Sequence, residues 1–143
     1  MGYQTDFYGS ICVEPPMDDV LVTFLTKFNK TRRMTRKNGP DYVDGTGFMG
    51  QGSDDDIINS NQPPEGQPSL WCQWVPFEDG TEIAWDQREK FYSAAEWMKY
   101  IIDRYIAPKG YVCNGEIEAQ GEDPYDRWRL VVEDNVVCVQ TLV

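Results

Sequence analysis

The C-terminal stretch of the chain reads YVCNGEIEAQGEDPYDRWRLVVEDNVVCVQTL, residues 111–142. Apolar and polar residues alternate through three runs of this stretch, and short polar segments rich in Gly, Asp and Asn separate the runs. A period of two is typical of strands that bury one face, so three such runs in succession predict an antiparallel meander. We expect its strands at about 111–120, 126–133 and 136–142.

Two amphipathic helices are predicted upstream of the meander. One apolar face runs through residues 17–31, with acidic residues near its start and basic residues near its end, as the helix macrodipole favours. A second apolar stripe marks residues 90–106, and Pro108 and Gly110 stop it. Each helix therefore has one face that must be covered by another element.

Three further strand patterns complete the expected fold, at residues 3–13, 70–77 and 81–85. The resulting order, βαββαβββ, predicts an α+β domain in which two helices pack on a mostly antiparallel sheet. A chain of 143 residues can bury one core without covalent staples. We therefore expect a single domain over residues 1–143.

Residues 38–69 fit none of these elements. Gly and Pro recur too often there for a long helix or strand, which predicts a long irregular loop. Such a loop inside a compact domain is unusual and is commonly functional or disordered. Its apolar residues, among them Tyr42, Phe48 and Ile57, favour an ordered segment that packs on the domain.

The balance of charge favours some partners and excludes others. The chain has 24 Asp and Glu against 13 Lys and Arg, a net charge of −11, and many of its cations lie in residues 27–37. A negative field repels nucleic acid and anionic membranes and attracts cationic protein surfaces. We therefore expect a basic protein surface as partner, and neither direct nucleic-acid binding nor membrane binding.

Several kinds of chemistry are not expected from this composition. The chain has no His, which excludes Ser–His and Cys–His nucleophile pairs. We expect no cofactor and no metal. Met1 to Asp6 lacks the basic and apolar regions of a signal peptide, so the expected compartment is cytoplasmic.

The four cysteines, Cys12, Cys72, Cys113 and Cys138, are widely spaced and lie in apolar, strand-like surroundings. This pattern predicts buried free thiols. A zinc site assembled from four strands is the alternative, although the chain has no C-x-x-C pair to indicate it.

Polar side chains gather on the predicted meander. Alternation places them on shared strand faces, with two more carboxylates in the first turn. One interpretation is a solvent-exposed face with cross-strand ion pairs. The other is a pocket that grips a polar ligand or uses a carboxylate pair as acid and base. The residues concerned are Glu116, Glu118, Gln120, Glu122, Asp123, Arg127 and Arg129.

Tryptophans are the candidate anchors of an interface. Trp71 and Trp74 are three positions apart, so in a strand they face opposite sides and one of them is left exposed. Trp128, between two arginines, is a second candidate. Core packing is the alternative for each of them.

The basic cluster, with Arg32 and Arg33, allows two interpretations. These cations either pair with the acidic loop that follows or contact a partner or ligand. The acidic run at residues 54–56, with Asp44 nearby, is likewise either a solvated charge run or a site for a hard cation. The run lacks the alternating ligands of ion-binding loops, so we favour the solvated run.

The chain resembles a group of small uncharacterised proteins that recur in bacterial and bacteriophage genomes. No activity is assigned to that group, so the resemblance transfers no catalytic residue. It implies an accessory protein of a mobile element. The matching stretches are MGYQTDFYG (1–9), RRM (32–34), GTGFMGQ (45–51), NQPPEGQPSLWCQW (61–74), EKFYSAAEWMKYII (89–102), and NGEIEAQGED followed by DRW (within 114–128).

The favoured hypothesis is a non-enzymatic, acidic protein-binding module. It would dock on a basic surface of a host nucleic-acid-binding or defence complex, as an accessory or inhibitor protein. The alternative is a small-ligand-binding protein or carboxylate-dependent enzyme with its site on the meander, under the 38–69 loop. An immunity-like or assembly protein without activity of its own is the third hypothesis.

Overall fold

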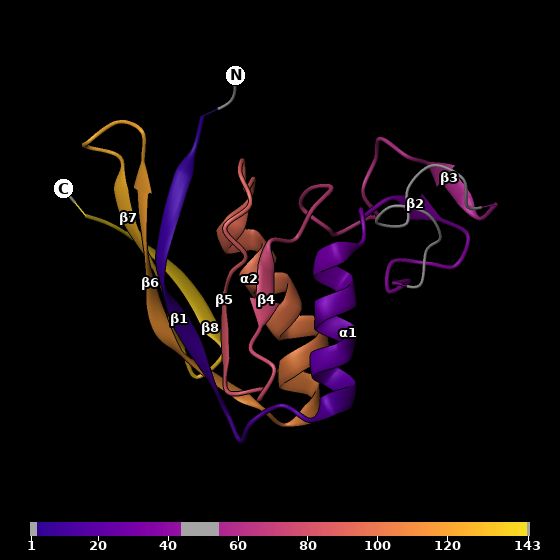
Figure 1. The fold of residues 1–143 in the computed structure, drawn as a ribbon, viewed down its shortest axis with the longest axis horizontal. Coiled ribbons are helices and arrows are strands. Elements are labelled where there is room, and N and C mark those ends of the chain that lie inside the picture. Colours follow the sequence, from indigo (N-terminus) through magenta and orange to yellow (C-terminus); the bar gives the residue numbers. More distant parts are fainter. Residues whose placement is uncertain (1–2, 44–54, 143) are drawn as a thin grey trace.

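The computed structural model describes residues 3–43 and 55–142 and confirms the α+β class (Figure 1). Six strands form one antiparallel sheet in the order β4-β5-β1-β6-β7-β8, and β2 and β3 form a separate two-stranded sheet. The strands are β1 (Thr5–Glu14), β2 (Thr35–Arg36), β3 (Ile57–Asn59), β4 (Trp74–Pro76), β5 (Glu82–Trp85), β6 (Val112–Gly121), β7 (Arg127–Glu133) and β8 (Val136–Thr141).

Both helices lie on the same side of the large sheet (Figure 1). The first, α1 (Asp19–Lys30), begins where an Asp18 carboxylate oxygen accepts a hydrogen bond from the Leu21 N–H at 2.8 Å. The second, α2 (Ala94–Ile101), continues through a π-helical segment, Ile102–Ile106, and a 3-10 turn, Ala107–Lys109. None of the described helices is both long and apolar enough to cross a membrane.

The central pair of strands is β1 and β6, which run antiparallel over ten residue pairs from Thr5↔Gly121 to Glu14↔Val112. Gly9 lies in this pair with a φ of +109°, and a Cβ there would sit 2.8 Å from the Glu116 carbonyl oxygen. A side chain would thus meet both backbone strain and a steric clash. The two longest strands therefore approach closely because residue 9 is glycine.

Aromatic rings fill the space between the sheet and the helices. Phe7 of β1 makes edge-to-face contacts with Trp74, Trp85, Phe91 and Trp128, at centroid distances of 5.4 to 5.9 Å. Such T-shaped pairs contribute beyond the apolar area that they bury. Strands β4, β5 and β7 thereby share one core with the segment that precedes α2.

Three element boundaries differ from the sequence prediction. The strand expected at 70–77 is reduced to β4, because its partner β5 ends at Trp85, just before Gln87 with a positive φ of 69°. The helix expected from residue 90 begins at Ala94, because Lys90 and Ser93 both have positive φ. The described part of the 38–69 loop is largely irregular but supplies β3, which pairs with β2.

Only two of the four thiols are buried, so the prediction of four buried cysteines is wrong. Cys72 and Cys113 lie in the core, where burial raises the pKa of each thiol to about 12. Cys12 and Cys138 are exposed. The strand alternation that turns Ile11 and Val13 inward turns Cys12 outward.

Replacing Gly9 with Ala is expected to lower the free energy of unfolding by about 3 kcal/mol, through left-handed strain and overpacking. Gly66→Ala is the matched control, because Gly66 has a φ of +89° but nothing within 4 Å of its Cβ position. This control should lose only about 1 kcal/mol. Urea denaturation measures the free energy of unfolding of both variants. Equal decreases in the two variants would contradict a close approach of β1 and β6.

Native protein at pH 8 is expected to react with a thiol reagent at Cys12 and Cys138 and to spare the two core cysteines. The thiolate is the reactive species, and burial together with a raised pKa suppresses it. Peptide mapping by mass spectrometry identifies the modified positions. In urea all four should react, whereas fast modification of Cys72 or Cys113 in the native protein would contradict the packing.

Candidate functional site

The sheet face that points away from the helices, here called the outer face, is acidic. Its side chains alternate with buried core residues along β1, β5, β6 and β7. Only two guanidiniums, those of Arg127 and Arg129, lie among its carboxylates on these four strands. The carboxylates are Asp6, Glu14, Glu82, Glu116, Glu118 and Glu133.

Arg129 of β7 pairs with two of these carboxylates. Its Nη2 lies 3.3 Å from Glu118 Oε1, and its Nε lies 4.0 Å from Glu116 Oε2. Both carboxylate side chains are at least half exposed, so each ion pair contributes little to stability. Three of the predicted site residues are thus brought together, as cross-strand pairs on an open surface.

An exposed tyrosine stands among these charges. Tyr8 of β1 lies directly opposite Glu118 in the β1–β6 register and is 58% exposed. Its exposure follows the alternation of side chains along β1, in which Asp6 is exposed, Phe7 is buried and Tyr8 is exposed. Tyr8 was not among the site residues predicted from the sequence, although its alternation with Phe7 was the signal that could have identified it.

The first turn of the meander holds the N-terminal residues in place. Tyr3 Oη donates to Asp126 Oδ2 at 2.8 Å and accepts from the Asp123 N–H at 3.0 Å. The Glu122 carboxylate accepts from the Gln4 N–H at 2.6 Å. The Gln120 amide bonds backbone carbonyls of the same turn. These groups do not converge on a pocket with the outer-face carboxylates.

The described part of the 38–69 segment, residues 38–43 and 55–69, does not cover the meander, contrary to the expected pocket. It lies at the C-terminal end of α1 and beside α2, away from β7 (Figure 1). Asp41 accepts from the Arg104 guanidinium at 2.8 and 3.0 Å, and from the Tyr105 hydroxyl at 2.6 Å. Gln67 donates to the Tyr100 hydroxyl at 3.1 Å.

The basic cluster serves the packing of this segment. Arg33 is only 2% exposed, stacks 4.1 Å over the Phe28 ring and donates to the Pro40 carbonyl at 2.6 Å. Burial lowers the pKa of Arg33 to about 10. Arg32 is partly buried and donates to the Ser60 carbonyl at 3.0 Å. Arg33 is therefore not an accessible partner contact, and Arg32 is engaged within the chain.

The acidic run is only partly described. Asp56 pairs with Arg36 at 2.9 Å and accepts from the Asn38 amide at 2.9 Å. Asp44, Asp54 and the glycine-rich stretch 45–52 lie outside the described residues. Among the residues that the structure describes, no three His, Cys, Asp or Glu side chains are grouped so that they could hold a metal ion.

The tryptophans do not protrude as expected. Trp74 is 2% exposed and belongs to the core. Trp71 is half-buried, with the Arg88 guanidinium 5.3 Å from its ring. Trp128 is also half-buried and faces the helices rather than the outer face, because it alternates with Arg127 and Arg129. No tryptophan therefore lies on the acidic surface.

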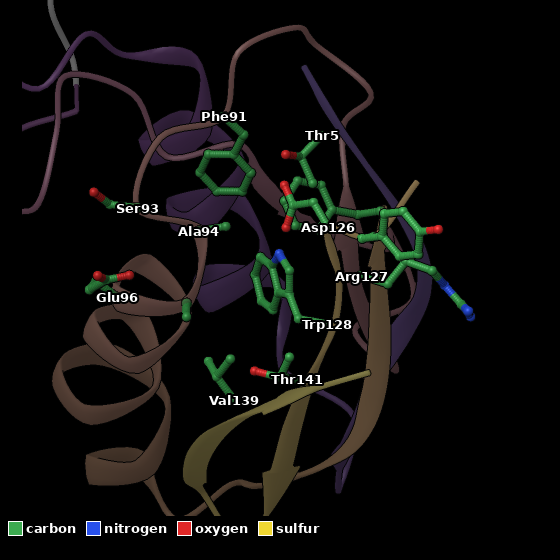
Figure 2. Close-up of a pocket in the computed structure, with 13 residues that line it drawn as sticks. Thr5, Phe91, Ser93, Ala94, Glu96, Asp126, Arg127, Trp128, Val139 and Thr141 are labelled. Carbon is green, nitrogen blue, oxygen red and sulfur yellow. The ribbon is translucent and has the colours of Figure 1, made fainter. Parts of the chain in front are cut away.

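Trp128 instead lines an open cleft of about 540 Å³ between α2 and the β7–β8 hairpin, here called the edge cleft. In Figure 2 the rings of Phe91 and Trp128 and the side chains of Val139 and Thr141 project into it. Glu96 of α2 and Asp126 supply its carboxylates, and the Arg127 guanidinium points away. The sequence analysis did not predict this cleft, since its walls come from distant parts of the chain.

Comparison of the sequence with models of protein families, with curated proteins and with solved structures finds no match. Function is therefore inferred from the geometry and charge of the described residues.

Asp41→Asn is expected to lower the free energy of unfolding at pH 7 by about 0.5–1 kcal/mol. The effect is small because the ion pair between Asp41 and Arg104 is exposed. The Arg104 hydrogen bonds lower the pKa of Asp41 below its usual value near 3.8. The stability that the Asp41–Arg104 pair contributes is therefore present above the usual pKa of Asp and is lost as the pH falls below it. Urea midpoints of variant and wild type should therefore converge near pH 2.

The control for this change is Asp103→Asn, which removes an exposed carboxylate 2.6 Å from Lys99 on the same helix. An i,i+4 pair contributes about 0.3–0.5 kcal/mol. If Asp41→Asn lowers the free energy of unfolding no more than Asp103→Asn does, or by an amount independent of pH, then Asp41 does not fix the loop to the helix.

Proposed function

We propose that this chain is a non-enzymatic binding module that docks through its outer face on a basic surface of another protein. The observation that carries the proposal is the set of outer-face carboxylates around exposed Tyr8, in a chain with a net charge of −11. An acidic sheet face of this kind is complementary to a cationic surface.

The two kinds of side chain on this face have different roles in docking. Carboxylates such as Glu116 and Glu118 accelerate encounter with a cationic partner, an effect that salt screens. Tyr8 supplies the rigid, amphipathic contact area that is enriched among residues that dominate binding energy. Arg129 partly neutralises its neighbours and holds them in one geometry.

The favoured partner is a protein whose surface is cationic because it handles nucleic acid. A molecule that covers such a surface competes with the nucleic acid for it. Together with the resemblance to proteins of mobile elements, this favours an accessory or inhibitor protein that acts on a host nucleic-acid-binding or defence complex in the cytoplasm.

A ligand-binding or enzymatic role for the meander carboxylates is less well supported. Glu116 and Glu118 face open solvent, and the described part of the 38–69 segment lies elsewhere. An acid–base pair needs an enclosed site that holds its substrate. Binding to a protein surface needs no such enclosure.

The double variant Glu116→Gln/Glu118→Gln is expected to weaken capture of the partner from host lysate about tenfold at low salt, mainly by slowing association. Tyr8→Ala should weaken it by about tenfold or more, through faster dissociation. Immobilised wild type and variants are compared by quantitative mass spectrometry and, once a partner is purified, by surface plasmon resonance.

Glu65→Gln/Glu78→Gln is the matched control, since it makes the same change in net charge at exposed positions off the outer face. It should weaken capture less than threefold. Raising the salt from about 50 to 500 mM should release the partner, because the Debye length falls several-fold. Capture that is indifferent to salt, or equal weakening by both double variants, would rule out docking by the outer face.

A further inference from the structure

We propose that the free edge of β8 binds an extended, cationic segment of the partner as a seventh, antiparallel strand, with alternate apolar side chains seated in the edge cleft. The cationic character of the segment rests on the proposed function. The strand addition itself rests on backbone geometry, exposure and the lining of the cleft.

The backbone of β8 is bonded on one side only. In the described sheet β8 has β7 as its single neighbour, and the Leu142 N–H donates to the Arg127 carbonyl at 2.9 Å. Bonded positions alternate along an antiparallel pair. The N–H and C=O groups of Val137, Val139 and Thr141 therefore point away from β7, toward the position of an added strand.

This edge lacks the features that usually prevent strand addition. Edge strands of monomers are protected by Lys, Pro or a bulge. The sequence of β8, VVCVQT, has no charge and no proline, and its pairing with β7 is regular. Val136 and Val139 are 61% and 54% exposed. The edge is thus apolar, accessible and free to pair.

The edge cleft is placed to take the side chains of an added strand. Val139 and Thr141 turn their side chains into it while their backbone groups face outward. Trp128 and Phe91 form the apolar surface beyond them (Figure 2). Every second side chain of an added strand would therefore enter the cleft, as in other strand-addition complexes.

Charge favours a cationic occupant over a second copy of this chain. Glu96 and Asp126 line the cleft, while the Arg127 guanidinium points away from it (Figure 2). A second copy would bring a net charge of −11 against the same charge. A segment with lysines or arginines between its apolar residues turns those cations to the outer face, where the negative charge of the whole chain, rather than Glu96 or Asp126, attracts them.

The test uses the full chain labelled with 15N and an end-capped hexapeptide of sequence KFKVKV. In an antiparallel addition the apolar residues of the peptide enter the cleft and turn their N–H groups toward β8. Saturating peptide should slow hydrogen exchange of the Val137, Val139 and Thr141 amides at least fivefold. Exchange in β1 should change less than twofold.

Two N-methylated peptides separate strand pairing from side-chain or charge contact. Methylation of the three apolar residues removes the N–H donors that face β8, and the affinity should fall at least tenfold. Methylation of the three lysines leaves those donors and should weaken binding less than threefold. Equal weakening by both peptides, or no exchange protection with KFKVKV, would overturn the proposal.

Variants of β8 give the same test from the protein side. Val139→Pro removes an N–H that does not bond β7, so the hairpin is retained and peptide affinity should fall at least tenfold. Val139→Lys places a charge in the cleft and should act likewise, whereas Gln140→Ala, on the outer face, should have less than a twofold effect. Unchanged affinity in both Val139 variants would reject the edge as the site.

Two further results separate this inference from the proposed function. In the first result, Glu116→Gln/Glu118→Gln abolishes partner capture, Val139→Pro does not change partner capture, and KFKVKV does not slow hydrogen exchange in β8. Only the strand addition then fails. If KFKVKV protects the edge but the outer-face variant captures partner normally, only outer-face docking fails. A dimer in sedimentation that buries the same amides without peptide would assign the edge to a second copy and overturn the proposal.

Discussion

The pairing of β1 with β6 is the constraint on which the rest of the structure depends. These two ten-residue strands lie at the centre of the sheet, and both edge hairpins are added to them. Because side chains alternate along both strands, one pairing register decides which residues enter the core and which face solvent. A slip of β1 by one residue against β6 would bury Tyr8 and expose Phe7.

That register separates two chemistries on opposite sides of one sheet. The helix side is aromatic, with Phe7 in contact with rings from β4, β5 and β7. The other side collects carboxylates with few cations. The basic residues that follow α1, such as Arg33 and Arg36, are occupied in attaching the 38–69 segment. The outer surface therefore keeps its negative potential, and the proposed docking uses it.

Periodicity predicted both helices and the six strands of the large sheet, because most of these elements bury one face. It did not predict β2 and β3, which are short and lie outside that sheet. It failed where the backbone turns for reasons that the pattern does not show. Because β5 ends at Trp85, ahead of a positive φ at Gln87, residues 70–72 have no partner strand, and positive φ at Ser93 delays α2. Alternation also placed Glu116 and Glu118 on one face with their Arg129 partner. The edge cleft could not be predicted in this way, since its walls meet only after β7, β8 and α2 have packed together.

The π-helical segment after α2 makes the core sensitive to chain length at one point. An α-helix closes each hydrogen-bonded turn over four residues and a π-helix over five, so Ile102–Ile106 accommodates one residue more than a regular helix would. Deleting one residue there would restore α-helical winding and leave the following residues on the same face, because four residues of an α-helix turn the chain about as far as five residues of the wider π turn. A further insertion would instead rotate the following residues by about 100°. Ile106, which is completely buried, would then turn out of the core just before the chain enters β6. This helical turn therefore has room to lose a residue but not to gain another.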